Sequence, residues 1–361
     1  VLTLLDNLRK LNIEVELLCI MEGVFTEEAR EMGIPVTIIP QEKRWDLSVL
    51  SKVKKFINNC GCDLVHCHGA RANYISLFIR GGVKVPMITT LHSDYKLDFK
   101  DNPRKQLIYT PINAFALRRY KHILAVTKAF KYMLMLRGFK EERIDVIYNG
   151  IDFSQELQTY DMYTFFKNIN VPHDLNKKYV GIAARLFAVK GVNVFLDMAK
   201  IIADKREDID FIILGNGEMW QQCQGFIKEN KLENRVYMAG QVTDPVMMNS
   251  YYKYIDVNTL TSYSESFPYA LLEGARCKCA TVATAVGGIP EMIIDGESGC
   301  LVQSGDSKAL AECVEMLCDK DDIRIRYGVN FYERAKENFS SQAMANTHKK
   351  IYEKIIKENV K

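Results

Sequence analysis

The chain has 361 residues, 48% of them hydrophobic, and a formal net charge of +3 at pH 7. A length in this range favours two domains, and this apolar content can fill two hydrophobic cores. Ten cysteines spread through so long a chain do not form a disulfide framework, and no apolar run approaches the roughly 18 residues that span a bilayer. These features exclude a small disulfide-stapled protein and favour reduced thiols in the cytoplasm.

The first half of the chain alternates between predicted helices and strands. It opens with an amphipathic helix, because Leu2, Leu5, Leu8 and Leu11 recur near the helical period. A domain of this kind ordinarily opens with a strand and a glycine-rich turn, so we expect about 15 further residues ahead of Val1. The strands predicted next are Val15–Ile20, Val36–Ile39, Leu64–His68, Met87–His92, His122–Val126 and Ile144–Tyr148, with helices at Thr26–Met32, Leu47–Asn58, Asn73–Ile79, Ile112–Tyr120 and Lys128–Arg137. Apolar strands with polar ends predict a parallel sheet that binds ligands at the carboxyl ends of its strands.

The second half repeats this alternation after a break. Residues 153–177 contain Pro172 and a charged run, which predict a linker with a short helix. The strands predicted after it are Tyr179–Ala184, Phe211–Leu214, Val236–Ala239, Val257–Leu260 and Thr281–Thr284, and the last helix is Ala343–Asn359. We therefore predict an α/β protein of two Rossmann-like domains, with an N-terminal domain at residues 1–155 and a C-terminal domain at residues 178–340.

Two glutamates eight residues apart, Glu265 and Glu273, lie in the segment ESFPYALLE. Because a helix interior excludes proline, we place Glu265 on a loop, Pro268 in the first turn and Glu273 inside the helix. Free N–H groups at such a helix start, here near Phe267 and Tyr269, attract an anion, and carboxylate oxygens accept from vicinal sugar hydroxyls. For the pair alone, a capped surface helix is the simpler explanation.

Cations and glycines follow the first two strands of the second domain. Arg185 and Lys190 lie in AARLFAVKG, and two cations beside a helix start can neutralise a departing diphosphate, although such residues are usually surface charges. The GNGE turn at residues 215–218 lets backbone approach a ligand. Trp220 stands where a dinucleotide-binding signature requires its last glycine, which disfavours a nicotinamide oxidoreductase.

Three histidines end predicted strands of the first domain, His66 and His68 in HCHGA and His92 in LHSDY. A lone histidine is more often structural than catalytic, and we interpret His66 as a core residue. Asp208 and Asp210 form a pattern typical of a metal motif. They lie just before a strand, where two acids that end a loop are the simpler interpretation.

The segment ESFPYALLEGARCKCATVATAVGGIPEMIIDGESGCLV resembles the nucleotide-sugar-binding core of the retaining glycosyltransferases of family 4. The resemblance covers nearly the whole chain and rests on several motifs in order. It implies the GT-B fold, two Rossmann-like domains facing a cleft, with the first strand of the N-terminal domain missing and the C-terminal helix 343–361 packed back on that domain. Lys278 and Ala280 stand where the family has glycine and proline, and Ser266 replaces a commoner glycine. We expect Lys278 and Ala280 to alter a turn rather than the chemistry, and the resemblance implies that a serine at position 266 is tolerated.

The resemblance implies transfer of a sugar from a nucleoside-diphosphate sugar, most often a UDP-sugar, to an acceptor hydroxyl with retention of configuration. Arg185 and Lys190 would stabilise the departing diphosphate, and Glu265 would orient the donor sugar. Glu273 would accept from the ribose hydroxyls, and His92 would contact the transferred sugar. The implied donor site comprises Arg185, Lys190, Gly215, Asn216, Gly217, Glu265, Ser266, Phe267, Pro268, Tyr269 and Glu273, with His92, Glu265, Arg185 and Lys190 as catalytic contacts and His68 on the acceptor side. No residue is placed as a dedicated nucleophile, and neither a cofactor nor a metal is expected.

Two further interpretations stay open. A sugar-nucleotide epimerase of the same fold would bind the same nucleotide without an acceptor, and a catalytically silent nucleotide-binding subunit would bind it without turnover. The isomeric nucleotide sugar made by an epimerase distinguishes the first from a transferase.

The charge of the chain is unevenly distributed. Residues 1–152 hold 23 Lys and Arg against 17 Asp and Glu, a balance of +6, and residues 153–361 hold 25 against 28, a balance of −3. Within Lys96–Lys140 there are 11 basic residues and 2 acidic ones, which favours an anionic membrane surface or a phosphate-bearing partner over nucleic acid, with an ordinary solvated face as the alternative. The residues predicted to form a lipid-binding helix are Lys128, Lys131, Arg137 and Lys140, interleaved with Phe130, Tyr132, Met133 and Met135. Such a helix suits a glycan or lipid-linked acceptor at the inner face of the plasma membrane, in polysaccharide assembly.

Overall fold

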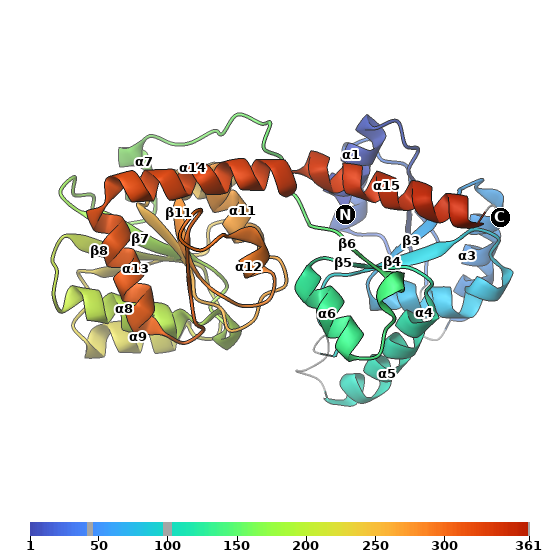
Figure 1. Cartoon of the computed structure of the whole chain (residues 1–361), viewed down its shortest axis with the longest axis horizontal. Coiled ribbons are helices and arrows are strands. Elements are labelled where there is room, and N and C mark those ends of the chain that lie inside the picture. Colours follow the sequence, from blue (N-terminus) through green and yellow to red (C-terminus); the bar gives the residue numbers. More distant parts are fainter. Residues whose placement is uncertain (42–45, 97–102, 360–361) are drawn as a thin grey trace. The chain divides into compact units, whose positions relative to one another are not determined.

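A computed structural model describes residues 1–41, 46–96 and 103–359 (Figure 1). The chain divides into two compact units: unit 1 is Val1–Gly150 with Ser341–Lys361, and unit 2 is Ile151–Ser340. All strands pair in parallel within each unit. The predicted α/β class with two Rossmann-like domains is therefore confirmed. Within the described residues, no helix combines the length and the apolar character that a bilayer crossing requires.

Unit 1 contains two parallel sheets. One pairs β1 (Leu17–Cys19) with β2 (Val36–Ile38), and the other has the order β3-β4-β5-β6, with β3 (Val65–His68), β4 (Met87–Leu91), β5 (Ile123–Ala125) and β6 (Ile144–Val146). The helices are α1 (Leu2–Lys10), α2 (Val24–Glu31), α3 (Ser48–Asn59), α4 (Ala70–Ile79), α5 (Pro103–Arg119), α6 (Lys128–Leu136) and α15 (Ser341–Asn359). Each strand predicted in the first half is present and slightly shorter than predicted.

The helix α5 is the main difference from the predicted elements of unit 1. The helix was predicted at Ile112–Tyr120, directly after Pro111. An interior proline removes one helical hydrogen bond and clashes with the preceding turn. In the structure α5 begins at Pro103 and continues through Pro111. Burial of Ala116 and Leu117, and a hydrogen bond from the Asn73 amide to Asn113 at 3.1 Å, hold it against its neighbours. Tertiary packing therefore outweighs the local cost of the proline.

The last helix, α15, packs on unit 1 (Figure 1). Its residues Ile351 and Ile355 join the core formed with Ile88 of the sheet. Met344 packs in a second cluster with Leu8 of α1. The first and the last helix of the chain, α1 and α15, thus share this second cluster.

Unit 2 has a single six-stranded sheet with the order β12-β11-β10-β7-β8-β9. Its strands are β7 (Lys178–Ala183), β8 (Ile209–Leu214), β9 (Val236–Gly240), β10 (Val257–Leu260), β11 (Ala280–Thr284) and β12 (Cys300–Val302). Its helices are α7 (Met162–Asn168), α8 (Val192–Ala203), α9 (Trp220–Glu229), α10 (Pro245–Tyr254), α11 (Tyr269–Arg276), α12 (Ile289–Met292), α13 (Ser307–Asp319) and α14 (Asp321–Asn338). The strand order reverses at β7, which has β8 on one side and β10 on the other. Parallel sheets bind ligands at such a reversal, outside the carboxyl ends of the strands.

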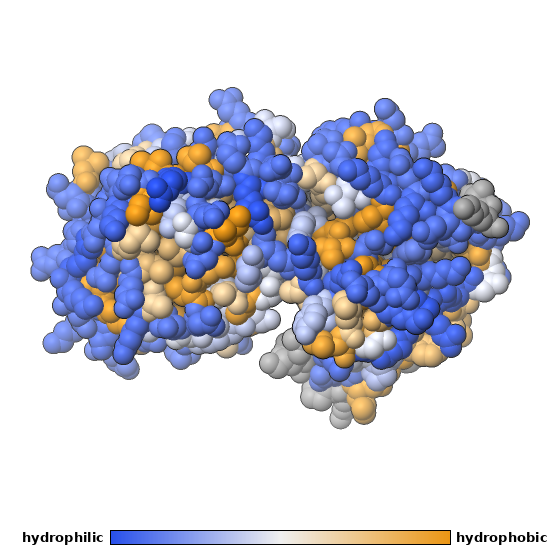
Figure 2. Space-filling model, in the orientation of Figure 1, coloured by the Kyte–Doolittle hydropathy of each residue, from blue (hydrophilic) through white to orange (hydrophobic). Residues whose placement is uncertain are grey.

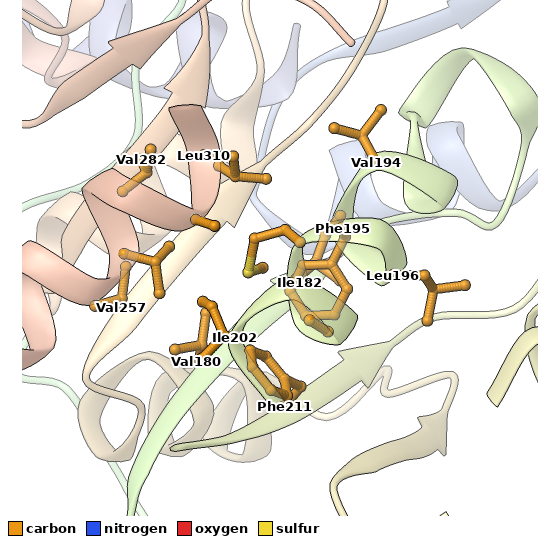
Figure 3. Close-up of a cluster of buried hydrophobic side chains, with 14 of the residues drawn as sticks. Val180, Ile182, Val194, Phe195, Leu196, Ile202, Phe211, Val257, Val282 and Leu310 are labelled. Carbon is orange, nitrogen blue, oxygen red and sulfur yellow. The ribbon is translucent and has the colours of Figure 1, made fainter. Parts of the chain in front are cut away.

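The core of unit 2 anchors the loops at this edge (Figure 3). Val180 and Ile182 of β7 are fully buried beside Phe195 of α8. The Phe195 ring contacts Phe211 of β8 edge to face, with centroids 6.2 Å apart. Burial of each such side chain contributes about 1.5–3 kcal/mol. The starting points of the loops after β7 and β8 are therefore held rigidly.

The turn after α11 places Lys278 in a left-handed backbone conformation. Lys278 has a φ of 56°, the left-handed conformation that glycine adopts readily. A side chain there costs about 1–2 kcal/mol. The lysine is thus accommodated with strain, in a backbone conformation that glycine adopts at no such cost.

Candidate functional site

The glycine turn after β8 packs against the loop after β7. A Cβ atom added at Gly215 would lie 1.8 Å from the Ala184 carbonyl oxygen, and one at Gly217 would lie 2.5 Å from that of Leu186. The Leu186 N–H donates to the Asn216 carbonyl at 3.0 Å. These glycines therefore permit an approach of backbone to backbone, which the sequence had suggested only for a ligand. The contact holds both loops at the edge of the sheet.

Lys190 and Glu265 form an ion pair on the other side of β7. The Lys190 ammonium donates to Oε1 of Glu265 at 2.6 Å, and the Ser262 hydroxyl donates to the same oxygen at 2.7 Å. The Glu265 side chain is only 8% exposed. An ammonium has three N–H donors, so Lys190 retains donors for a ligand after this bond. The structure thus joins two of the predicted catalytic residues directly.

The loops that carry this pair are tied together by their backbones. Gly191, just after Lys190, has a φ of 63°, and a Cβ atom there would lie 2.1 Å from the Thr261 carbonyl oxygen. The Thr261 hydroxyl donates back to the Gly191 carbonyl at 2.9 Å. The Tyr263 N–H also donates to the Val189 carbonyl at 2.8 Å. The short distance between Lys190 and Glu265 is therefore imposed by the loop backbones.

A second glycine turn packs against the backbone of Glu265 and Ser266. Gly287, in the AVGGIPE segment, has a φ of 55°, and a Cβ atom there would lie 1.7 Å from the Glu265 carbonyl oxygen. The Gly288 N–H donates to the Ser266 carbonyl at 3.1 Å. The close contact with the backbone of Glu265 therefore requires a glycine at position 287.

The helix α11 begins one residue later than predicted. Pro268 has a ψ of 119° and precedes the helix, because its backbone is extended, so it does not lie in the first turn. No side chain caps this helix start and no acidic residue lies in its first turn, which leaves the positive end of the helix dipole uncompensated. Phe267 is buried against Phe339, with ring centroids 5.4 Å apart, whereas Tyr269 is 47% exposed. The Phe267 side chain therefore anchors the loop to the core of unit 2.

A pocket of about 290 Å³ lies at the carboxyl ends of β7 and β8. Its walls are formed by Ala183, Ala184, Arg185, Leu214, Gly215, Asn216, Gln241, Val242, Met248, Tyr252, Ala270 and Glu273. Four predicted donor-site residues thus meet in one cavity, whereas Lys190 and Glu265 are not among its walls. Gln241 directly follows β9, and the same strand-end argument would have found it. Met248 and Tyr252 lie on α10, where the sequence offered no signal.

Glu273 has the environment of an acceptor for hydroxyl donors. The Tyr252 hydroxyl makes a long hydrogen bond to Oε2 of Glu273, at 3.5 Å. Burial raises the pKa of Glu273, and the positive charge of Arg276 opposes that effect. A carboxylate has about four acceptor positions, so Glu273 can accept from two vicinal hydroxyls as well.

Asp210 has a structural role. It lies inside β8, which begins at Ile209, and not ahead of the strand as predicted. Its carboxylate is 3% exposed and pairs with Lys177 at 2.9 Å and with Arg235 at 2.8 Å. Across the described ranges, no group of three or more His, Cys, Asp or Glu side chains is placed to hold a metal ion.

The predicted histidines lie together in unit 1, at the ends of β3 and β4. Nδ1 of His68 is 3.0 Å from Nε2 of His92, and the two rings stack at 5.3 Å. His66 lies deeper, within hydrogen-bonding distance of Tyr352 on α15 at 2.6 Å and of Thr90 at 2.7 Å. Burial lowers the pKa of His66 and His68 well below the ordinary value. His66 therefore joins α15 to the sheet, while His68 and His92 form a pair.

His348 of α15 makes unit 1 sensitive to acid. It is 1% exposed, its Nδ1 lies 2.8 Å from the Met344 carbonyl, and burial lowers its pKa from 6.5 to about 4. Between these values the unfolded chain binds a proton that the folded chain does not, so stability falls as the pH falls. Because of His348, we expect the free energy of unfolding of unit 1 to fall by up to about 3 kcal/mol between pH 7 and pH 4.

Melting temperatures at pH 7 and pH 5 measure this effect. The variant His348→Leu should lose less stability on acidification than the native chain, and His173→Leu, at an exposed position of unit 2, should lose as much as the native chain. Equal losses in all three proteins would contradict the assignment to His348.

The helix predicted to lie on anionic lipid is α6, and several of its residues make contacts within unit 1. Phe130, Met133 and Met135 of α6 pack against the core of unit 1. Lys131 pairs with Glu141 at 3.0 Å. Arg137 pairs with both carboxylate oxygens of Asp94, at 2.6 and 2.7 Å. Most of the residues predicted to contact lipid are therefore engaged within unit 1, although Tyr132 stays 62% exposed.

Solved structures share this fold. The Anabaena HepE protein in complex with UDP matches 98% of this chain with 95% of its own, with a TM-score of 0.80 and 20% identity. A glycosyltransferase from Rickettsia africae matches 98% of this chain with 93% of its own, with a TM-score of 0.81 and 19% identity. Two parallel-sheet units of this kind make up the GT-B fold.

Two family models account for most of the chain. Residues 1–155 match the model of Glycosyltransferase Family 4, and residues 165–338 match that of Glycosyl transferases group 1. The chain belongs to the family 4 glycosyltransferases and is an enzyme of that class.

Curated relatives extend along both units. N-acetyl-alpha-D-glucosaminyl L-malate synthase of Bacillus anthracis is 24% identical over 87% of this chain and 81% of the relative. N,N'-diacetylbacillosaminyl-diphospho-undecaprenol alpha-1,3-N-acetylgalactosaminyltransferase of Campylobacter jejuni is 24% identical over 92% of this chain and 89% of the relative. A further relative, from Staphylococcus aureus, is named for capsular polysaccharide biosynthesis.

Proposed function

We propose that this enzyme transfers a glycosyl group from a UDP-sugar to an acceptor hydroxyl, with retention of the anomeric configuration, during assembly of a cell-surface polysaccharide or glycolipid. One observation carries the proposal: Arg185, Glu273 and the first turn of α11 line one pocket at the reversal of the strand order. A guanidinium binds diphosphate oxygens, a carboxylate accepts from the two ribose hydroxyls, and a helix start favours an anion. These three groups together match a nucleoside diphosphate.

The reaction breaks the bond between the anomeric carbon and the diphosphate oxygen, and the electron pair leaves with UDP. The acceptor oxygen bonds to the anomeric carbon on the same face, and its proton passes to the departing phosphate. Arg185 and Lys190 stabilise the negative charge that develops on the leaving group. Glu265 fixes the Lys190 ammonium at 2.6 Å and orients a sugar hydroxyl. His92 contacts the transferred sugar, and His68 lies on the acceptor side.

The relatives support this choice of donor and acceptor class. HepE of Anabaena was solved with UDP and with UDP-glucose, so UDP is the first nucleotide to test. The Campylobacter relative is named for a diphospho-undecaprenol acceptor, and a Staphylococcus aureus relative for capsular polysaccharide biosynthesis. A lipid-linked or glycan acceptor therefore agrees with the proposal.

Thermal stabilisation by UDP, GDP, ADP and NAD tests the donor site. A ligand at about 100 times its Kd stabilises the native state by about 2.7 kcal/mol, so we expect UDP to raise the melting temperature of unit 2 selectively. Arg185→Ala and Glu273→Ala should each lower the affinity for UDP at least about tenfold, which corresponds to the loss of one charged hydrogen bond.

Two substitutions on the surface of unit 2 are matched controls. Arg326→Ala and Glu229→Ala replace exposed residues of the same types and should leave the UDP shift unchanged. The absence of a shift with UDP, or equal shifts in all variants, would overturn the proposed donor site. Release of UDP from a UDP-sugar, without an isomeric nucleotide sugar, would exclude the epimerase.

A further inference from the structure

A groove in unit 1 lies between α4 and α5, and none of the predicted site residues lines it. Its volume is about 720 Å³. Its walls include Phe78 of α4 and Ile112 and Phe115 of α5, and its only charged lining residues, within the part of the chain described, are Arg80 and Arg119. The groove is thus an apolar surface with two cations.

Large apolar side chains extend from this groove into solvent. Phe78 is 58% exposed and Phe115 is 49% exposed, and Leu107 and Ile108 at the start of α5 are 79% and 51% exposed. Ile108 and Phe115 are seven residues apart, so they lie on one face of α5. Figure 2 shows apolar residues along the lower edge of unit 1, over α5. Contiguous apolar surface of this kind marks an interaction site.

The charge of this surface has one sign. Residues 70–82 and 103–121 contain no Asp or Glu. Neither Arg80 nor Arg119 forms an ion pair with a residue that the structure describes. The Arg119 guanidinium lies over the Phe115 ring, 4.8 Å from its centroid, so a cation and an inserting ring are adjacent. The occupant of this face must therefore combine apolar groups with negative charge.

We propose that the α4–α5 face docks on an anionic phospholipid bilayer. Phe78 and Phe115 enter the boundary between head groups and acyl chains, and Arg80 and Arg119 bind lipid phosphates. A bilayer offers both features over the width of a head group, whereas a symmetric second copy would bring the same arginines together. This inference rests on the proposed function for its biological sense, since a lipid-linked acceptor resides at such a surface. It replaces α6 by the α4–α5 face as the lipid contact.

Vesicle co-sedimentation of the full chain tests the proposal. The vesicles contain phosphatidylcholine alone, or phosphatidylcholine with phosphatidylglycerol in a ratio of about 2:1. We expect at least about tenfold stronger binding to the anionic vesicles, and a loss of that preference in high salt. Equal binding to both kinds of vesicle, or no binding to either, would overturn the proposal.

Two double variants locate the contact. Phe78→Ser/Phe115→Ser and Arg80→Gln/Arg119→Gln change exposed side chains, and each should reduce binding to anionic vesicles at least about tenfold. Tyr132→Ser/Leu136→Ser removes exposed apolar residues of α6 and should leave binding unchanged. Native binding by both α4–α5 variants, or its loss only in the α6 variant, would refute the assignment.

Two further measurements separate this inference from its alternatives. In the native chain, a UDP shift without binding to anionic vesicles refutes the lipid surface and leaves the proposed function in place. In the α4–α5 variants, an intact UDP shift shows that unit 2 is still folded and that the loss of vesicle binding is local. Sedimentation velocity without lipid detects self-association. A dimer that Phe78→Ser/Phe115→Ser abolishes would assign this face to a second copy and overturn the lipid proposal.

Discussion

Replacement of Glu265 by glutamine is expected to lower kcat by about 10²–10³-fold, the usual effect of removing one group aimed at a transition state. Oε1 of Glu265 accepts from Lys190 at 2.6 Å and from Ser262 at 2.7 Å. Glutamine keeps the shape but loses the charge, so the Lys190 ammonium loses its partner and the sugar loses a charged acceptor. Affinity for UDP should change only a few-fold, because Lys190 keeps its charge and the residues that line the pocket, Arg185 and Glu273 among them, are unchanged.

The measurement compares initial rates of UDP release with the UDP-dependent shift in melting temperature. Glu229→Gln, an exposed glutamate of α9, is the control and should retain full activity. Because Lys190 and Glu265 act as one unit, the double variant K190M/E265Q should lose little more activity than either single variant. Additive losses, or a Glu265→Gln enzyme within threefold of native activity, would contradict this role.

Replacement of Gly287 by alanine should be the most damaging change outside the pocket. The added Cβ atom would lie 1.7 Å from the Glu265 carbonyl oxygen, and a backbone atom cannot move away as the end of a flexible side chain can. We expect a loss of about 3 kcal/mol or more in the stability of unit 2, from steric overlap added to a left-handed backbone. Activity should fall as well, because the overlap displaces Glu265.

Gly296 provides a matched control. It has a φ of 74°, similar to the 55° of Gly287, but an added Cβ atom there meets nothing within 4 Å. Gly296→Ala should therefore show only the backbone cost, about 1–2 kcal/mol. Denaturant unfolding of both variants, together with measurement of their kcat, separates the cost of the backbone conformation from the cost of the steric overlap. Equal losses of stability in the two variants would show that the contact with Glu265 is unimportant.

Several predictions from the sequence rested on local rules and agree with the structure. The alternation of apolar strands with helices predicted the strands of the three parallel sheets except β12, because buried strands need apolar residues on both faces. The rule that ligand-facing residues follow the strands predicted positions for Arg185 after β7 and Gly215 after β8, and both line the pocket. These inferences need only residues close together in the chain.

Other predictions failed where distant residues decide. The amphipathic pattern of α6 was visible in the sequence, but its apolar side turns to the core and Arg137 meets Asp94, 43 residues away. The start predicted for α5 at Ile112, after Pro111, agrees with the local rule for proline, yet the helix begins at Pro103 and burial of Leu117 outweighs the cost. The exposed face of α4 and α5 could not be predicted, because the sequence does not reveal which apolar residues lack partners.

The sequence by itself determined the class of fold, the order of elements and most of the residues at the strand ends. These depend on periodicity, on proline and glycine, and on motif order. Only the tertiary structure decided that Lys190 donates to Glu265 across 75 residues, and that Gly287 supports the same glutamate from another loop. Such contacts arise from the packing of loops on a finished sheet, and a hydrogen bond or a steric overlap is decided within a few tenths of an ångström.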